Sequence, residues 1–161
     1  MKIIPARFIS QTLFAALLLG SLTSWAGDWS LKDTAGVRYS LAGLQGRWVL
    51  VNFWAPWCPT CLQEIPDLIT LQKRPDVQII GVAVMYKTKK EVTDVVKSQS
   101  INYPIVFGNE DIASDFGSMP GMPTSYLYSP AGKLIGQHSG PLTLAEIEYA
   151  IAHEGSTLFA R

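Results

Sequence analysis

Charge is scarce in this sequence, and its two signs cancel. Charged residues make up 16% of the 161 residues, and thirteen Lys and Arg balance thirteen Asp and Glu, for a formal net charge of +0. Disordered tails and coiled coils carry far more charge, and a nucleic-acid-binding face needs an excess of Lys and Arg. We therefore expect one compact domain, which a chain of this length can fill, and no nucleic-acid partner.

Cysteine and histidine are scarcer still. The sequence holds two cysteines, Cys58 and Cys61, and two histidines, His138 and His153. A structural zinc site needs four ligands, and these histidines lie far from the cysteines without zinc-finger spacing, so we expect no metal site. A domain of this size does not need a disulfide, and one closing so short a loop would stabilise it little. The pair is therefore expected to carry chemistry, with zinc or an inert disulfide as the alternatives.

The one long hydrophobic run lies at the beginning of the chain. Two basic residues precede a mostly apolar segment from Phe8 to Leu22, and Ser24-Trp25-Ala26 places small residues at the −3 and −1 positions of a cleavage site. This pattern predicts a signal peptide over residues 1–26 and a domain over residues 27–161. The densest apolar run is short for a membrane span, which needs roughly 20 residues. We expect a periplasmic or otherwise exported protein, soluble after cleavage, with an uncleaved membrane anchor as the alternative.

The rest of the chain alternates between strand and helix patterns. Residues 48–54 and 77–84 are almost continuously apolar, which is typical of strands covered on both faces. Helical spacing follows each of them, and Thr88 and Thr143 each begin a capping box. The remaining expected elements are strands at 104–106, 124–128 and 133–137, a short helix after Asn109 and a loose tail over 155–161. This order predicts an α/β fold with a central mixed β-sheet flanked by helices and a short N-terminal extension.

The cysteine pair lies between a buried strand and the start of a helix. Unpaired backbone N–H groups at a helix start stabilise a thiolate, so the pKa of the Cys58 thiol should fall. Cys58 is thus expected to be the nucleophile, and Cys61, one turn inside, to resolve the mixed disulfide. Because the pair follows an aromatic strand and Pro56-Trp57 and opens a helix, it indicates a redox motif.

Residues 51–61, VNFWAPWCPTC, resemble the active-site segment of the thioredoxin superfamily. Asn52 and the following Phe-Trp are similar to the exported TlpA/ResA/DsbE branch, and the match continues through Leu62-Gln63-Glu64-Ile65-Pro66 and Gly121-Met122-Pro123-Thr124. The similarity extends from about Trp29 to His153. It implies a thioredoxin-like fold and a protein thiol–disulfide oxidoreductase.

The resemblance also implies roles for the second motif. Pro123 is expected to be cis and to face the cysteines, where the exposed backbone of Met122 could pair with an extended substrate. Trp57, Met122 and Thr124 are the candidate substrate-binding residues. An ordinary turn proline is the alternative, and Pro120 competes for the role, although a strand starting at Thr124 favours Pro123.

Glu64 lies about one helical turn beyond Cys61. If partly buried, it could exchange a proton with Cys61 during disulfide reduction, and the resembled reductases carry an acid here. The alternative is a solvated helix glutamate. Asn52 stands where cytoplasmic thioredoxins have a buried acid, and we expect it to be a hydrogen-bonded core amide. Met85 and Met119 are candidates, with Tyr86 and Met122, for an adaptable apolar docking surface.

Together these features predict an exported reductase of disulfides in protein substrates. The two sulfurs carry both electrons, so no small cofactor is expected. The resemblance implies recharging by a membrane reductant of the DsbD/CcdA kind, and we expect a monomer. Cytochrome c maturation is one possible role, but Thr124 replaces the acid of that subgroup, so a general TlpA-like reductase is equally open. The alternatives are a dithiol oxidase of the DsbA type, a copper-site assembly factor on a thioredoxin scaffold, and a redox-inactive binding module.

Overall fold

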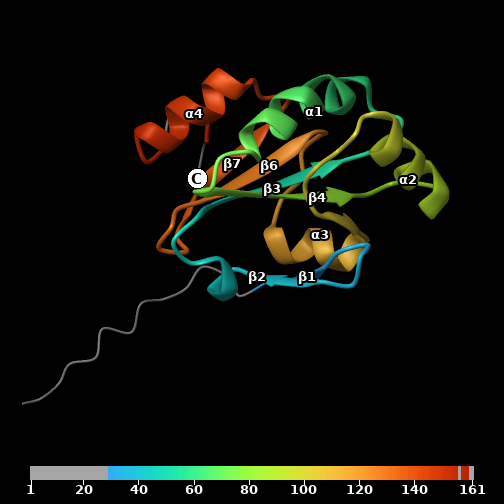
Figure 1. Ribbon diagram of the computed structural model, residues 1–161, viewed down its shortest axis with the longest axis horizontal. Helices are drawn as coiled ribbons and strands as arrows, with labels where there is room; N and C mark the ends of the chain where they lie inside the picture. The colour runs from blue at the N-terminus through green and yellow to red at the C-terminus, as the bar shows by residue number, and fades with distance from the viewer. Residues whose placement is uncertain (1–28, 156, 160–161) are drawn as a thin grey trace, which may run out of the picture.

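A five-stranded sheet forms the centre of the molecule (Figure 1). The computed structural model describes residues 29–155 and 157–159, so the predicted signal peptide over residues 1–26 lies outside it. The strand order is β5-β4-β3-β6-β7. The parallel strands are β3 (Trp48–Trp54), β4 (Val77–Ala83) and β5 (Ile105–Phe107). β6 (Thr124–Tyr128) pairs antiparallel with β3, and β7 (Leu134–Ser139) pairs antiparallel with β6. This mixed sheet confirms the predicted α/β class.

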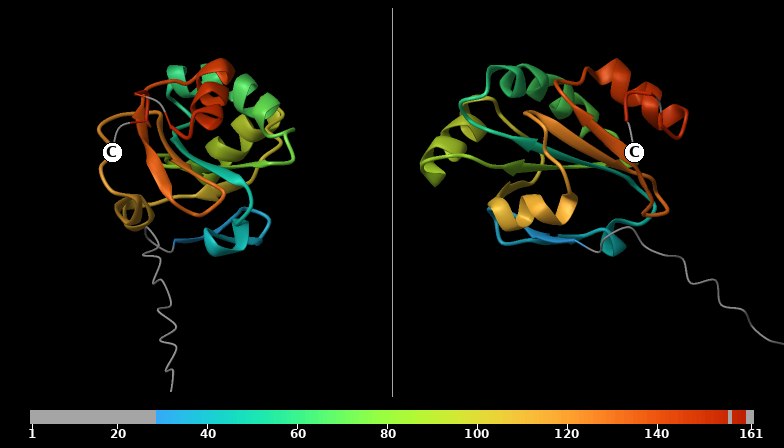
Figure 2. Two further views of the ribbon diagram at one scale, coloured as in Figure 1. Left: turned by 90° about the vertical axis from the view of Figure 1, so that its left-hand side faces the viewer. Right: turned by 180° about the vertical axis from the view of Figure 1, so that it is seen from behind.

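The two faces of the sheet are covered by different elements (Figures 1 and 2). On one face lie α1 (Pro59–Leu71), α2 (Lys89–Ser98) and α4 (Leu144–Ala152); on the other lie α3 (Glu110–Phe116), the hairpin of β1 (Ser30–Lys32) with β2 (Arg38–Ser40), and a short 3₁₀ turn, η1 (Ala42–Leu44). Every residue of β3 and β4 is buried, and side chains alternate between the faces, so Leu50 and Val51 enter separate cores. In the described part of the chain, no helix has the length and apolar character needed to cross a membrane.

The helix starts follow the predicted caps with one exception. At α4, the hydroxyl of Thr143 accepts from the N–H of Glu146, and the Glu146 carboxylate accepts from the N–H of Thr143, at 3.3 and 2.9 Å. At α2, Thr88 accepts from the N–H of Glu91, but the Glu91 carboxylate accepts from the N–H of Lys87. The capping box predicted at Thr88 is therefore only half formed, because the carboxylate reaches one residue further back.

The prediction of a loose tail was wrong for residues 157–159. Phe159 is 4% exposed and belongs to the core on the α1 and α4 face, and its ring lies 6.1 Å from that of His138. Nδ1 of His138 lies 2.9 Å from the carbonyl oxygen of Leu158. His138 is thus half-buried under the tail. A three-residue contact leaves no periodic pattern in the sequence, and here it rests on the buried ring of Phe159 together with the His138–Leu158 contact.

Candidate active site

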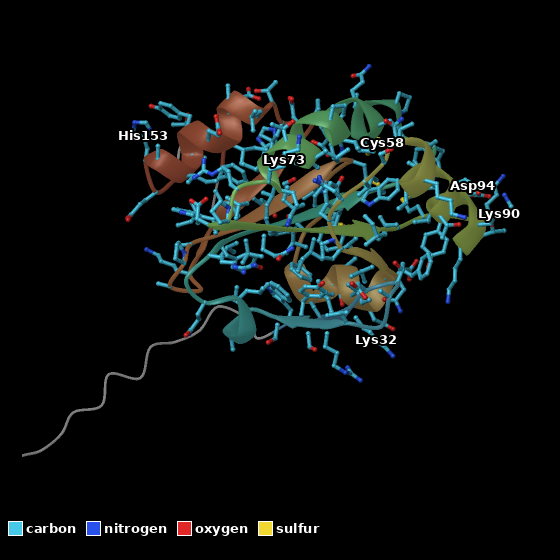
Figure 3. The ribbon with its side chains drawn as sticks, in the orientation of Figure 1. Lys32, Cys58, Lys73, Lys90, Asp94 and His153 are labelled. Carbon is cyan, nitrogen blue, oxygen red and sulfur yellow. A yellow bond between two sulfur atoms is a disulfide. The ribbon has the colours of Figure 1, made fainter. Side chains whose placement is uncertain are left out.

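The end of β3 delivers the cysteine pair to the start of α1. Figure 3 shows Cys58 there, at the end of the molecule that also carries Lys90 and Asp94 of α2. Cys58 and Cys61 form a disulfide with their Cα atoms 5.3 Å apart. Cys58 is the N-cap, its Sγ accepts from the N–H of Cys61 at 3.3 Å, and Pro59 opens the helix as predicted. When the bond is reduced, this N–H would stabilise a thiolate on Cys58.

The loop before β6 lies against the disulfide. The Met122–Pro123 peptide bond is cis, and the Met122 carbonyl oxygen is 3.9 Å from Sγ of Cys58. Pro123 itself is buried. Thr124 is fully buried, and its hydroxyl donates to the carbonyl of Gly121 at 2.7 Å. The loop therefore lies against the cysteines, as the resemblance implies. The side chain of Thr124, however, is buried within the loop and bonds the loop's own backbone.

An apolar groove opens beside Cys58. It has a volume of about 340 Å³ and is lined by Trp57, Cys58, Pro59, Met85, Met119, Gly121 and Met122. Trp57 and Met85 are 57% and 67% exposed, and the indole N–H of Trp57 donates to the Met85 carbonyl at 2.8 Å. Cys58 is 5% exposed and lines the groove, whereas Cys61 is 1% exposed and is not among the groove residues. An incoming disulfide can therefore meet Cys58 but not Cys61, which fits the predicted division into nucleophile and resolving cysteine.

A second groove continues from the first. It encloses about 510 Å³ and shares Met85 and Met119 with the active-site groove, and it extends past Tyr86 to Asn109 and Glu110 at the start of α3. Methionine side chains adapt their shape to varied apolar partners. The four residues predicted to form a docking surface thus line one or both grooves, and Met85 and Met119 join the two.

Glu64 is buried on α1, about one helical turn beyond Cys61. Its exposed fraction is 2%, which excludes the alternative of a solvated glutamate. One carboxylate oxygen accepts from Nδ2 of Asn52 at 2.7 Å and the other from the N–H of Leu142 at 3.1 Å. Burial raises the pKa of Glu64 to about 7, and the two hydrogen bonds oppose that rise without cancelling it. Near neutral pH, this carboxyl group can therefore either accept or give a proton.

Asn52 connects Glu64 to the neighbouring strand. It is 1% exposed, and Nδ2 also donates to the hydroxyl of Ser125 at 3.1 Å. Its expected role as a hydrogen-bonded core amide is confirmed, but its partners could not be predicted. Ser125 and the N–H of Leu142 are 73 and 78 residues away from Asn52 and Glu64, respectively. The only sequence signal was a serine within an otherwise bulky buried strand.

No metal-binding cluster is formed by the residues that the structure describes. Among residues 29–155 and 157–159, no three His, Cys, Asp or Glu side chains are grouped to hold an ion. His153 is the C-cap of α4, lies at the opposite end of the molecule from Cys58 (Figure 3), and stacks on Tyr149.

Known proteins resemble this chain in sequence and in fold. The AhpC/TSA family profile matches residues 23–137. The thioredoxin-like protein YneN of Bacillus subtilis (strain 168) is 35% identical over 127 residues, covering 76% of this chain and 74% of YneN. The thiol-disulfide oxidoreductase ResA of the same organism is 31% identical over 142 residues, covering 84% and 79%. A solved thiol:disulfide interchange protein of the thioredoxin family from Chlorobium tepidum TLS superposes with a TM-score of 0.72 at 30% identity, over 80% of this chain and 94% of that one. The predicted thioredoxin-like fold is confirmed.

Proposed function

The chain belongs to the AhpC/TSA family of thioredoxin-like proteins and is a thiol-disulfide oxidoreductase of the ResA type, and from this premise we propose that it reduces disulfide bonds in polypeptides outside the cytoplasm. The observation that carries the proposal is the asymmetry of the cysteine pair. Cys58 lines an open groove, whereas Cys61 is enclosed beside the buried carboxyl group of Glu64. A pair built in this way can attack with one sulfur and resolve with the other.

The reaction proceeds by two thiol–disulfide exchanges. The reduced thiolate of Cys58 attacks one sulfur of the substrate disulfide, and the other substrate sulfur leaves as a thiolate. Cys61 then gives its thiol proton to the Glu64 carboxylate and attacks Sγ of Cys58, which expels the second substrate thiolate. The substrate gains two electrons, the protein is left with the disulfide seen here, and no small cofactor takes part.

The grooves favour a polypeptide substrate over a small disulfide. A segment lying across Cys58 would contact Trp57 and the methionines, which accept varied side chains, and could pair with the backbone at Met122. The second groove extends this surface beyond the cysteine that is attacked. A small disulfide would leave most of this apolar surface uncovered.

The cellular setting rests on the sequence pattern and on the resemblance. The pattern over residues 1–26 supports a location outside the cytoplasm, where the protein would act as a monomer and receive electrons from a membrane reductant of the DsbD/CcdA kind. Reduction of apocytochrome c before haem attachment is one role open to such a protein. General reduction of exported proteins is the other.

Trapping tests the proposal. A Cys61→Ser variant should accumulate mixed disulfides between Cys58 and exported polypeptides, because the resolving thiol is gone. Cys58→Ser is the matched control and should trap none, since the remaining thiol is buried. The wild type should reduce insulin with dithiothreitol as the electron source. If the wild type leaves insulin unreduced and Cys61→Ser traps nothing, the protein is a redox-inactive binding module.

A further inference from the structure

Three polar side chains meet in the core behind the cysteine pair. Asn52 on β3, Glu64 on α1 and Ser125 on β6 are 1%, 2% and 0% exposed. Asn52 and Ser125 are directly opposite each other in the antiparallel β3–β6 pair, so their side chains leave the sheet on the same face. Nδ2 of Asn52 uses one hydrogen on Glu64 and the other on Ser125.

This arrangement suits the carboxylate form of Glu64 and conflicts with the acid form. Both carboxylate oxygens accept from N–H groups, one from Asn52 and one from the backbone of Leu142. A protonated carboxyl group has one O–H to donate, and neither Nδ2 nor a backbone N–H can accept it. An unpaired polar group buried at this depth destabilises the folded protein. A proton exchanger in this position therefore needs a partner that changes its own role.

We propose that Asn52, supported by Ser125, is a reversible hydrogen-bond partner that turns its side-chain amide when Glu64 takes up a proton. In the carboxylate state, Nδ2 donates to Glu64 and Ser125, as the structure shows. In the acid state, a half turn of the amide brings Oδ1 to face them, where it accepts from the Glu64 O–H and from the Ser125 hydroxyl. Asn52 is thus a positioning residue for the reaction.

The inference rests on the proposed function for the source of the proton. Cys61 supplies it as its thiol becomes the thiolate that attacks Cys58, and Glu64 changes from carboxylate to acid. The Asn52 amide can be a neutral donor in one state and a neutral acceptor in the other, whereas an ionised aspartate at this position could only accept and a leucine could do neither.

Two other titratable groups near Glu64 must be separated from it. Tyr103 is buried, and both its burial and the Glu64 charge raise the pKa of its phenol, so it stays neutral. His138 on β7 lies opposite Ser125 in the sheet register. Besides these two groups on other elements, α1 itself carries Cys61 and Asp67, and the Asp67 carboxylate accepts from the N–H of Leu144, in the same loop as Leu142. The hydroxyl and backbone partners contributed by β6 and the loop before α4 do not titrate.

Nuclear magnetic resonance of the oxidised protein tests the inference directly. With ¹⁵N-labelled side-chain amides and ¹³C-labelled carboxyl groups, the Asn52 amide signals should move with the same midpoint pH as the Glu64 carboxyl carbon. Below that midpoint, the amide protons should lose the downfield shift of a bond to a carboxylate. Amide signals that stay fixed through the Glu64 titration, or that keep this downfield shift in the acid form, would overturn the inference.

Variants identify the groups responsible. Glu64→Gln should abolish the Asn52 transition; a transition that persists belongs to another group such as His138 and contradicts the inference. Asn52→Leu removes the donor to the carboxylate and should raise the Glu64 midpoint by about one pH unit. The matched control is Gln78→Leu, since Gln78 is a buried strand amide bonded to Ile79 and Arg47. It should lower stability but leave the Glu64 midpoint unchanged, whereas equal shifts in both variants would overturn the role of Asn52.

These readouts do not depend on turnover. If the Asn52 amide signals share the Glu64 midpoint pH but the wild type reduces no insulin and Cys61→Ser traps nothing, the proposed function fails. The inference that Asn52 is a reversible hydrogen-bond partner of Glu64 is then still supported. If insulin is reduced while Asn52 ignores Glu64, the function stands and this inference fails.

Discussion

At the scale of single residues, Glu64 shows how burial and hydrogen bonding compete at one carboxyl group. Two N–H donors favour its ionised form, because hydrogen bonds to a carboxylate stabilise the charge. Loss of water around a group that is 2% exposed outweighs both, and the pKa of Glu64 rises to about 7. Near neutral pH, where a proton must be exchanged with Cys61, Glu64 is therefore divided between its ionised and neutral forms.

This raised pKa predicts how stability depends on pH. The pKa of Glu64 is 4.5 in the unfolded chain and about 7 in the folded protein, so the folded state holds the proton more tightly. This proton binding stabilises the folded state below pH 4.5, and the stabilisation is lost as pH rises to about 7. Glu64→Gln stays neutral throughout. Relative to the wild type, the variant should gain about 3 kcal/mol of unfolding free energy between pH 4 and pH 8. Urea unfolding of the oxidised proteins across this range measures it, and parallel profiles would show that Glu64 is ionised normally.

Glu146 supplies a control of opposite sign. The backbone N–H of Thr143, followed by its hydroxyl, lowers the pKa of this exposed-side carboxyl group at the start of α4. The stabilisation that Glu146 contributes is present above the pKa that it has in the unfolded chain, and it is lost as pH falls. Glu146→Gln should therefore lose stability relative to the wild type as pH rises from 3 to 6, so the two glutamine variants should diverge in the same set of titrations.

Met85 combines an unfavourable backbone with an exposed side chain. Its φ is 53°, in the left-handed region that favours glycine, and its side chain forms a wall shared by both grooves. Met85→Gly should keep the unfolding free energy within about 1 kcal/mol of the wild type, because relief of strain offsets the added freedom of the unfolded chain. The same change should weaken insulin reduction several-fold, seen as a lower kcat/KM.

Ser100→Gly is the matched control for Met85. Ser100 also has a positive φ, 56°, but it follows α2 and lines neither groove. Its variant should show a similar small change in stability with unchanged kcat/KM. Equal activity in the two glycine variants would remove Met85 from the substrate surface.

At the scale of whole elements, the start of α4 links the capping box to the site. Thr143 caps the helix, and the N–H of the preceding Leu142 donates to Glu64. Thr143→Ala removes the acceptor for the N–H of Glu146 and the hydroxyl that donates to the Glu146 carboxylate, and should cost about 1 kcal/mol of unfolding free energy. Thr88→Ala, at the half-formed box of α2, should cost less. Urea midpoints compare the two, and a larger loss at Thr88 would contradict the role given to the complete box.

The elements that sequence patterns predicted are those fixed by local rules. The continuous burial of 48–54 and 77–83 follows from strands covered on both faces, and the helix at Cys58 follows from a cap, Pro59 and an apolar stripe. The partners of Glu64 instead depend on the β3–β6 register and on the loop before α4, which join residues more than 70 positions apart. The position of Phe159 depends on its packing in the core, which no local sequence pattern records.

At the scale of the whole molecule, the parts form a path from surface to core. The grooves lead to Cys58, the disulfide leads to Cys61, and Glu64 with Asn52 and Ser125 lies between α1 and the sheet. The two strands that carry this amide and hydroxyl, β3 and β6, are also the ones whose ends deliver Cys58 and Pro123. One strand pair therefore positions both the sulfur chemistry and the proton chemistry.

The direction of electron flow is a property of the whole domain, and the reduction potential of the Cys58–Cys61 pair measures it. A reductase held reduced by a dedicated donor should have a potential near or below about −230 mV, because its own disulfide must be more stable than the substrate disulfide that it reduces. Equilibration in glutathione buffers would give the value, with fluorescence of Trp57, which borders the disulfide groove, and of the buried Trp54 as the signal. Cys61→Ser, which cannot form the bond, is the control and should show no transition. A value near about −120 mV would make the protein a dithiol oxidase of the DsbA type. The fold and the cysteine pair would then serve the opposite reaction, with Glu64 returning its proton to Cys61 as the disulfide passes to the substrate.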